Sequence, residues 1–363
     1  FFSKDCIGCS DCFGCMGLRS KKYHIFNTPY SKDAYEKKIK EFRLDIHQNI
    51  ERFKEEARAF WLTRPHKFAH VLRNANATGD YVYGSKNAKD MYMVSEGTEN
   101  ARYCQIITMS GAKDAYDYTL WGNGAQRIYE AMIAGEGAES VKFSLEAWSN
   151  VRDIEYSLMV LSSSNMFGCA NIRNKQYCIL NKQYSKEEYK KLREQIIRDM
   201  NERPYKDKVG RAYPYGEFFP PELSLFGYNE TYAASFFPLA REKAQQQGFL
   251  WYDAKTNAYM PTMKASDLPD SIAEVTDSIL QDIIECGQCT KAFRIIPAEL
   301  SLLRRFNLPL PRMCPNCRYQ QRWSRINKSG LYDRTCQCVG RTSENGVYAN
   351  TASHRHASDH CPN

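Results

Sequence analysis

Apolar residues between positions 87 and 156 recur in pairs that are three residues apart. Each pair belongs to a segment that opens on Asn or Gly and has two mostly polar residues between its apolar ones. The segments begin every 11–13 residues: NAKDMY (87–92), NARYCQ (100–105), GAKDAY (111–116), GAQRIY (124–129), GAESVKF (137–143) and NVRDIEY (150–156). A short apolar run typical of a β-strand follows each one. Strands at this period predict a mainly β fold, a right-handed parallel β-helix (solenoid) in which about two segments make one coil.

The N-terminal stretch CIGCSDCFGC (6–15) has the same three-residue spacing, here with cysteines. Because free cysteine packs as a small hydrophobic residue, we interpret these thiols as inward-facing core residues. The alternative is a metal or iron–sulfur site, since C-x-x-C brings two thiolates to one ion. The predicted core cysteines are Cys6, Cys9, Cys12, Cys15, Cys104 and Cys169.

A longer repeat relates FGCMGLRSKKYHIFNTPYSKDAYEKK (13–38) to FGCANIRNKQYCILNKQYSKEEYKKL (167–192), at a constant offset of 154 residues. The chain therefore contains two copies of one unit. Helical apolar spacing follows each copy and predicts a helix over 30–62, starting at Ser31, and another from Ser185 that ends before Pro204. We expect these amphipathic helices to cap or buttress the solenoid.

These patterns divide the chain into seven segments. In order they are solenoid coils (1–29, expected to continue a preceding part of the protein), a helical insertion (30–67), the β-solenoid (68–183), a capping helix (184–203), an aromatic and proline-rich segment packed as extended chain (204–263), a linker with a short helix (264–284) and a zinc-binding module (285–363).

Composition adds a mild basic bias and a preference for a reducing compartment. The 363 residues carry a formal net charge of +8, which is compatible with an anionic partner. No apolar run reaches the roughly 18 residues of a membrane span. The 14 cysteines lie largely in close pairs toward the two ends, and this arrangement favours metal sites in the cytoplasm over disulfides.

The strongest chemical signal is a pair of C-x-x-C motifs, CGQC (286–289) and CPNC (314–317). Two such knuckles at this spacing predict one Zn²⁺ held by Cys286, Cys289, Cys314 and Cys317, in a zinc ribbon. A site closed by four thiolates leaves no position for water, so the metal is expected to fold the module and not to catalyse. A second, looser cluster predicts a second zinc site: Cys336, Cys338, His360 and Cys361.

Arginine and aromatic residues alternate after the second knuckle. Arg318, Arg322, Trp323 and Arg325 form a candidate surface for RNA or a ribonucleoprotein, by phosphate contact and base stacking. The alternative is a surface for protein docking.

Three functions compete at this stage. A non-catalytic binding or scaffold protein is the first, and a self-assembling or protein-docking solenoid is the second. The third is a carbohydrate-active enzyme, because Asp90, Asp114 and Asp153 are interpreted as recurring at equivalent repeat positions and could stack into an acidic row. No nucleotide loop, G-x-S-x-G or H-E-x-x-H motif is present, so an enzyme is the weaker expectation.

The chain resembles an uncharacterised family of cysteine-rich zinc-ribbon proteins from ultra-small bacteria of the candidate phyla. The matching text is FGCANIRNKQYCILNKQYSKEEY (167–189), YGEFFPPELSLFGYNET (215–231) and CGQCTKAFRIIPAELSLLRRFNLPLPRMCPNCR (286–318). The resemblance implies a solenoid and zinc knuckles and no particular activity. It also implies further cysteine-rich coils before Phe1 and a further C-x-x-C after Asn363.

Overall fold

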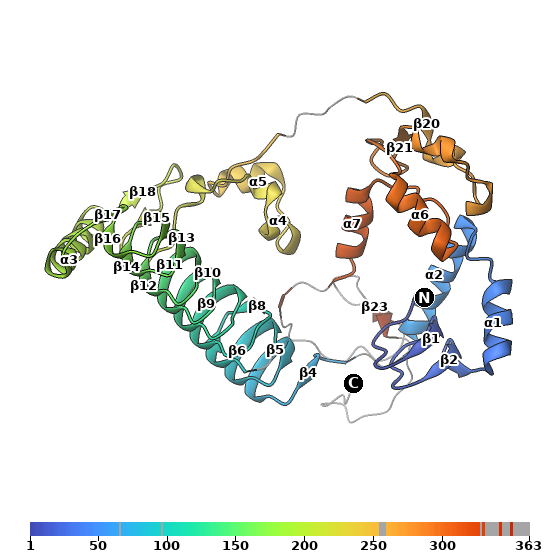
Figure 1. The fold of residues 1–363 in the computed structure, drawn as a ribbon, viewed down its shortest axis with the longest axis horizontal. Coiled ribbons are helices and arrows are strands. Elements are labelled where there is room, and N and C mark those ends of the chain that lie inside the picture. Colours follow the sequence, from blue (N-terminus) through green and yellow to red (C-terminus); the bar gives the residue numbers. More distant parts are fainter. Residues whose placement is uncertain are drawn as a thin grey trace. The chain divides into compact units, whose positions relative to one another are not determined.

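The structure is a computed structural model that describes residues 1–64, 67–95, 97–253, 259–326 and 329–330, with the backbone of 341–342 and 349–350 (Figure 1). The chain forms two compact units. The end unit combines the described residues of 1–66, 255–327 and 334–363, and the stack unit combines those of 67–254 and 328–333. The stack unit is therefore inserted into the sequence of the end unit. The fold is mainly β, as predicted.

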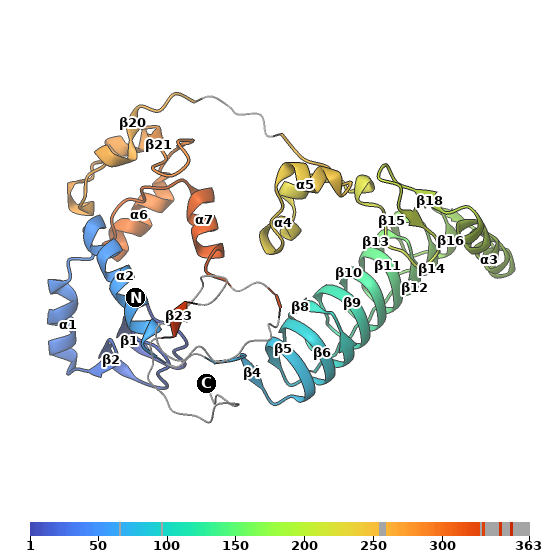
Figure 2. The ribbon, with the colours of Figure 1, turned by 180° about the vertical axis from the view of Figure 1, so that it is seen from behind.

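The stack unit is built on one 14-stranded sheet, whose strands lie side by side along the unit (Figure 2). All of its pairings are parallel except the last, β16 with β17. The strands are β4 (Val71–Leu72), β5 (Ala75–Tyr83), β6 (Lys86–Val94), β7 (Glu99–Arg102), β8 (Gln105–Ile107), β9 (Lys113–Trp121), β10 (Gln126–Ala134), β11 (Glu139–Trp148), β12 (Arg152–Glu155), β13 (Leu158–Leu161), β14 (Ser164–Phe167), β15 (Ala170–Arg173), β16 (Gln176–Ile179) and β17 (Lys182–Gln183).

Each sequence repeat forms one layer of this sheet. Lys113 pairs with Gln126, and Gln126 pairs with Glu139, so every repeat lies directly on the next one. The expectation that two repeats share one layer was wrong, because a single repeat already returns the chain to the same register.

The three-residue period has a backbone cause. Asn87 and Asp90 have positive φ angles of 49° and 55°, and each directly precedes a fully buried residue, Ala88 and Met91. Left-handed backbone is costly for most L-residues but tolerated by Asn, Asp and Gly. The chain therefore turns at every third residue, which explains why these residue types recur between the apolar positions.

The core of the stack unit is a set of buried columns that run from layer to layer. Small residues fill one column at its start and larger ones toward its end. In order along the sheet, this column contains Ala88, Ala101, Ala115, Ile128, Val141, Ile154, Met166 and Cys178.

The long repeat is a cap that ends a stack of parallel strands. In the second copy, β17 turns back antiparallel to β16, and the Asn181 side chain both donates to and accepts from the backbone of Ala170, at 2.8 Å each. In the first copy, Asn27 makes the same two bonds to Met16, at 2.9 Å each. The first copy contains β1 (Ser10–Phe13), β2 (Lys22–Ile25) and β3 (Thr28–Pro29).

A helix follows each cap. Helix α3 (Lys186–Glu202) begins after Ser185, whose hydroxyl accepts from the backbone N–H of Glu188 in a capping box, as the sequence predicts. The helix expected over 30–62 is instead two helices, α1 (Lys32–Glu41) and α2 (His47–Leu62). The break comes at Arg43, which has a φ of 46°. The Asp45 carboxylate, two residues later, accepts hydrogen bonds from the Arg43 and Ser271 side chains.

The segment 264–284, predicted as a linker with a short helix, contains only short 3-10 helices and packs as part of the C-terminal module. It forms β20 (Met263–Lys264), three 3-10 turns η3 (Ala265–Asp267), η4 (Ile272–Glu274) and η5 (Asp277–Leu280), and leads into β21 (Ile284–Glu285). Its apolar residues belong to the core of the C-terminal module, as Leu268 and Ile279 show. Pro269 interrupts the helical spacing that the sequence suggests.

The aromatic segment 204–253 is only partly extended. Residues 215–219 lie along the stack unit, where the Tyr156 hydroxyl donates to the Glu217 carbonyl at 3.1 Å. The remainder forms short elements, contrary to the prediction of extended chain: β18 (Tyr205–Lys206), β19 (Ala212–Tyr213), η1 (Pro221–Leu223), η2 (Tyr228–Glu230), α4 (Tyr232–Phe236) and α5 (Arg241–Gln246).

The C-terminal module adds β22 (Ala292–Phe293), α6 (Pro297–Phe306) and α7 (Pro315–Trp323), and the backbone of β23 (Arg341–Thr342) pairs with β24 (Ala349–Asn350). Among the residues that the structure describes, no helix combines the length and apolarity needed to cross a membrane.

Candidate metal centre

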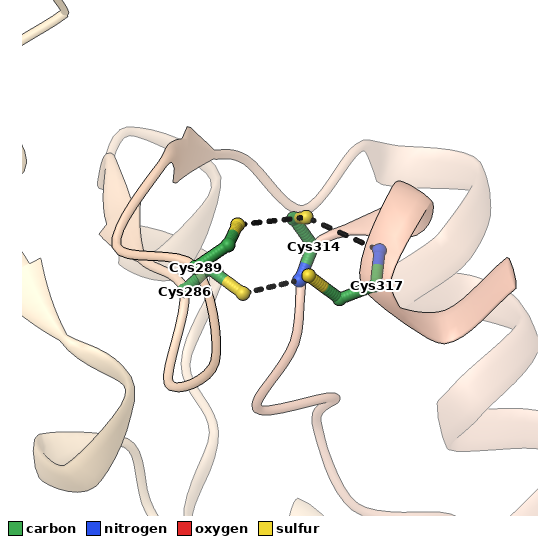
Figure 3. A group of neighbouring side chains, drawn as sticks. All are labelled: Cys286, Cys289, Cys314 and Cys317. Atoms are coloured by element: carbon green, nitrogen blue, oxygen red, sulfur yellow. Dashed lines mark hydrogen bonds between the residues drawn. The ribbon is translucent and has the colours of Figure 1, made fainter. Parts of the chain in front are cut away.

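Four cysteines from two separate loops converge in the C-terminal module (Figure 3). Cys286 follows β21, and Cys289 lies in the turn that leads to β22. Cys314 is the N-cap of α7, and Cys317 lies in the first turn of that helix. The two C-x-x-C motifs thus place one knuckle on a turn between short strands and the other on a helix start.

The geometry fits a tetrahedral metal ion. All four Sγ atoms lie within 4.8 Å of one another, and those of Cys289 and Cys314 are 3.7 Å apart. Four thiolates at about 2.3 Å from a tetrahedral zinc ion lie about 3.8 Å from each other. Within the described part of the chain, this is the single group of three or more such side chains at this spacing.

Backbone N–H groups point at the sulfur atoms. The N–H of Cys314 donates to Sγ of Cys286 at 3.2 Å, and that of Cys317 donates to Sγ of Cys314 at 3.5 Å. Burial raises the pKa of the Cys286 thiol, but such backbone bonds outweigh it and lower that pKa to about 6. Burial and the neighbouring thiols raise the pKa of Cys317. A bound cation would displace the protons that the thiols of the cluster carry.

A small apolar core surrounds the thiols. Cys286 and Cys314 are buried among Ile284, Ile295 and Leu310. Arg312 ties this core to the preceding segment, because its guanidinium donates to the carbonyls of Ala265, Leu268 and Pro269 at 2.7–3.0 Å.

The second predicted zinc cluster lies outside the described residues. Cys336, Cys338, His360 and Cys361 all fall in that part of the chain.

The predicted core cysteines are placed differently from the metal cluster. Cys15, Cys104 and Cys169 are fully buried, and Cys12 is buried too, whereas Cys6 and Cys9 are half-buried. Burial, with the neighbouring thiols, raises the pKa of Cys12 to about 11, so this thiol is protonated at neutral pH. The structure adds Cys178, which the sequence reasoning missed although it stands at an apolar position of the second cap.

The arginines of the module divide into paired and exposed groups. Arg318, a predicted partner-binding residue, donates to Glu299 at 2.7 Å, so a carboxylate of the same module compensates its charge. Arg322 and Arg325 are exposed at the end of α7. The rings of Tyr319 and Trp323 stack on the same helix, with centroids 5.7 Å apart.

The predicted acidic row does not form. Asp114 and Asp153 occupy equivalent positions, next to the register-matched Lys113 and Arg152. Asp90 lies three residues further along its layer, because Ala88 aligns with Ala115 through Ala101. Because the sequence pattern repeats every three residues, shifting one repeat by three residues against the next leaves the pattern unchanged. The sequence therefore did not reveal that Asp90 is out of register.

Comparison of the chain with family models, curated proteins and solved structures gave no match.

Proposed function

We propose that the protein is a non-catalytic zinc-binding scaffold that contacts an anionic partner, RNA or a ribonucleoprotein, through the exposed face of α7. The observation that carries the zinc assignment is the convergence of four Sγ atoms within 4.8 Å. Zinc is the ion of choice for a tetrahedral site made of four thiolates.

The role of the zinc is structural. All four tetrahedral positions are taken by protein sulfur, so no position is open for water or substrate. The surrounding core is small, and its two knuckles come from loops 25 residues apart, at Cys289 and Cys314. A zinc ion that links the two knuckles would add to the folding free energy, to which the small core alone contributes little.

The proposed RNA-binding surface contains one arginine fewer than the sequence suggests. Arg322 and Arg325 are exposed, and Tyr319 and Trp323 offer a stacked aromatic pair beside them. Exposed guanidinium groups neutralise phosphates, and aromatic rings stack on unpaired bases. Arg318 is left out of this surface because Glu299 neutralises it.

We also propose that the parallel layers of the stack unit wind as a right-handed β-solenoid, that the chain belongs to the cysteine-rich family it resembles, and that it works in the cytoplasm. The direct stacking of successive repeats supports the first point. Free thiols at every described cysteine suit a reducing compartment.

Self-assembly or protein docking is the competing proposal. Leu225 and Phe226 expose 77% and 60% of their surface, which is unusual for such large apolar side chains in a row. A carbohydrate-active enzyme is not proposed, since Asp90 is out of line with Asp114 and Asp153.

Binding of single-stranded poly(U) RNA at several salt concentrations tests the RNA proposal. The double variant R322A/R325A should weaken binding and lower the slope of log K against log salt by about two, one for each lost phosphate contact. The control R173A/K175A removes the same charge from exposed positions of the stack unit and should leave the slope unchanged. Undetectable binding at low salt, or an unchanged slope for R322A/R325A, would overturn the RNA proposal. Size determination by light scattering would then test self-assembly.

A further inference from the structure

One outer face of the stack unit carries exposed tyrosines and carboxylates in adjacent columns. Tyr116 of β9 pairs with Tyr129 of β10, and the next residues along these strands are Asp117 and Glu130. Tyr103 precedes them in the layer below, directly after Arg102, which pairs with Tyr116. Tyr103, Tyr116 and Tyr129 each expose 41–46% of their surface. We call this surface the tyrosine face.

At the lower end of the tyrosine face, the protein holds a cation of its own. The guanidinium of Arg102 lies 4.5 Å from the centroid of the Tyr103 ring, and its Nε donates to Oδ2 of Asp90 at 3.1 Å. On this surface, an arginine side chain of the protein thus contacts an aromatic ring and a carboxylate from neighbouring layers at once.

At the upper end of the tyrosine face, the Glu155 carboxylate is also neutralised by cationic side chains of the protein itself. Glu155 receives both Arg193 nitrogens at 2.7 and 2.8 Å, and Nζ of Lys142 lies 3.2 Å from it. The Tyr215 hydroxyl donates to the same carboxylate at 2.9 Å.

The middle of the face has carboxylates without a cation. Within the described residues, Asp117, Glu130 and Glu217 form no ion pair. All three carboxylates lie close enough to Tyr129 to raise the pKa of its hydroxyl. Burial raises the pKa of both Asp117 and Glu130, and for Glu130 the nearby charges of Asp117 and Glu217 add to the increase. Phe218 and Phe219 of the 215–219 segment are each 38% exposed, and the Phe218 backbone hydrogen-bonds to the Glu130 carboxylate.

We propose that the middle of the tyrosine face, formed by Tyr116, Asp117, Tyr129 and Glu130 with Glu217, binds an arginine side chain of a partner protein. The occupant is an extended, arginine-containing peptide segment. Charge complementarity selects it, because three uncompensated carboxylates repel phosphates and acidic peptides. The arrangement of Arg102 on Tyr103 and Asp90 gives the binding mode: the guanidinium lies on a tyrosine ring and donates to a carboxylate of the neighbouring layer.

The test uses the full chain and a fluorescent peptide, Gly-Arg-Gly-Arg-Gly, followed by anisotropy at low salt. The same peptide with citrulline in place of arginine keeps the shape and removes the charge. The arginine peptide should bind, more weakly as salt increases, and the citrulline peptide should bind roughly tenfold more weakly or not at all. Equal binding of the two peptides would contradict the proposal.

Variants then locate the site. D117N/E130Q keeps side-chain shape and should reduce affinity for the arginine peptide by roughly tenfold. Y129A should also weaken binding, whereas Y129F, which keeps the ring, should not. The control D153N/E187Q removes two exposed carboxylates elsewhere on the stack unit and should bind as the wild type does. If D117N/E130Q binds the peptide unchanged, or if it abolishes binding of poly(U) RNA that the wild type shows, the assignment of an arginine-binding face is wrong.

Discussion

The carboxylate of Asp45 accepts a hydrogen bond of 2.9 Å from the hydroxyl of Ser271, although the two residues are 226 positions apart. The same carboxylate receives Nε and Nη2 of Arg43 at 2.9 and 2.8 Å. Two backbone hydrogen bonds strengthen this junction between residues 43–47 and 270–272. The N–H of Ile272 donates to the Asp45 carbonyl at 3.2 Å, and the N–H of His47 donates to the Asp270 carbonyl at 3.0 Å. These bonds join the N-terminal helices to the segment that leads into the metal module.

Replacing Asp45 with Asn should therefore destabilise the end unit by about 1–3 kcal/mol, because the buried Ser271 hydroxyl and the Arg43 guanidinium lose a charged acceptor. Urea unfolding monitored by tryptophan fluorescence measures the change. The control E55Q removes an exposed carboxylate from α2 and should be neutral. Equal stability of D45N and wild type would show that this junction contributes nothing to the end unit.

Acid should weaken the same junction in a defined pH range. The Arg43 guanidinium, with a further contribution from Ser271, lowers the pKa of Asp45 to about 2 despite its burial. A carboxyl group whose pKa is lower in the folded state stabilises the fold above its unfolded pKa of about 3.9. That contribution is lost as pH falls from about 4 to about 2. Unfolding free energies of wild type and D45N should converge over this range, and a constant difference down to pH 2 would contradict the assignment.

The paired side-chain hydrogen bonds of Asn27 and Asn181 predict that the caps contribute measurably to stability. N181D keeps a residue that tolerates the positive φ of 64° but removes the Nδ2–H that donates to the Ala170 carbonyl. It should cost about 1–2 kcal/mol in the stack unit. Amide hydrogen exchange should show the loss first in β16 and β17. The control N171D changes an exposed asparagine with a similar φ of 53° and should leave exchange in these strands as in the wild type.

The N-terminal cysteines should behave as core residues and not as ligands. C12A should lower the stability of the end unit by about 1 kcal/mol, through loss of a small buried group. It should leave the metal content unchanged. Mass spectrometry under native conditions compares the metal content of C12A and wild type, and loss of bound iron or zinc in C12A would restore the ligand interpretation of Cys6, Cys9, Cys12 and Cys15.

The sequence predicts what is local and periodic in this fold. Some of the positive-φ corners are Asn, Asp or Gly, such as Asp11 and Asn87, so the inward positions of Cys12 and Ala88 that follow them could be found. The same period hides the register, because a shift of three residues preserves the pattern, as at Asp90 and Asp114. The convergence of Cys286, Cys289, Cys314 and Cys317 was predictable because paired C-x-x-C motifs at this spacing bring four thiols together.

Long-range polar contacts left no such record. The sequence around Asp45 contains no pattern that indicates Ser271 as its partner. Helical spacing alone therefore predicts neither the break between α1 and α2 nor the docking of the 264–284 segment. The same reasoning applies to Arg318, whose charge is compensated by Glu299 from a different helix.

Zinc content of the purified full chain, compared between wild type and C289S/C317S, tests the central claim most directly. The variant replaces one ligand from each knuckle with a residue that binds zinc poorly at neutral pH. We predict that it contains one zinc fewer per chain than the wild type and that the end unit unfolds at lower temperature, as the wild type does after chelator treatment. The double control C104A/C169A should keep the wild-type zinc content. Equal zinc content in C289S/C317S and wild type would contradict the account of a zinc-stabilised module.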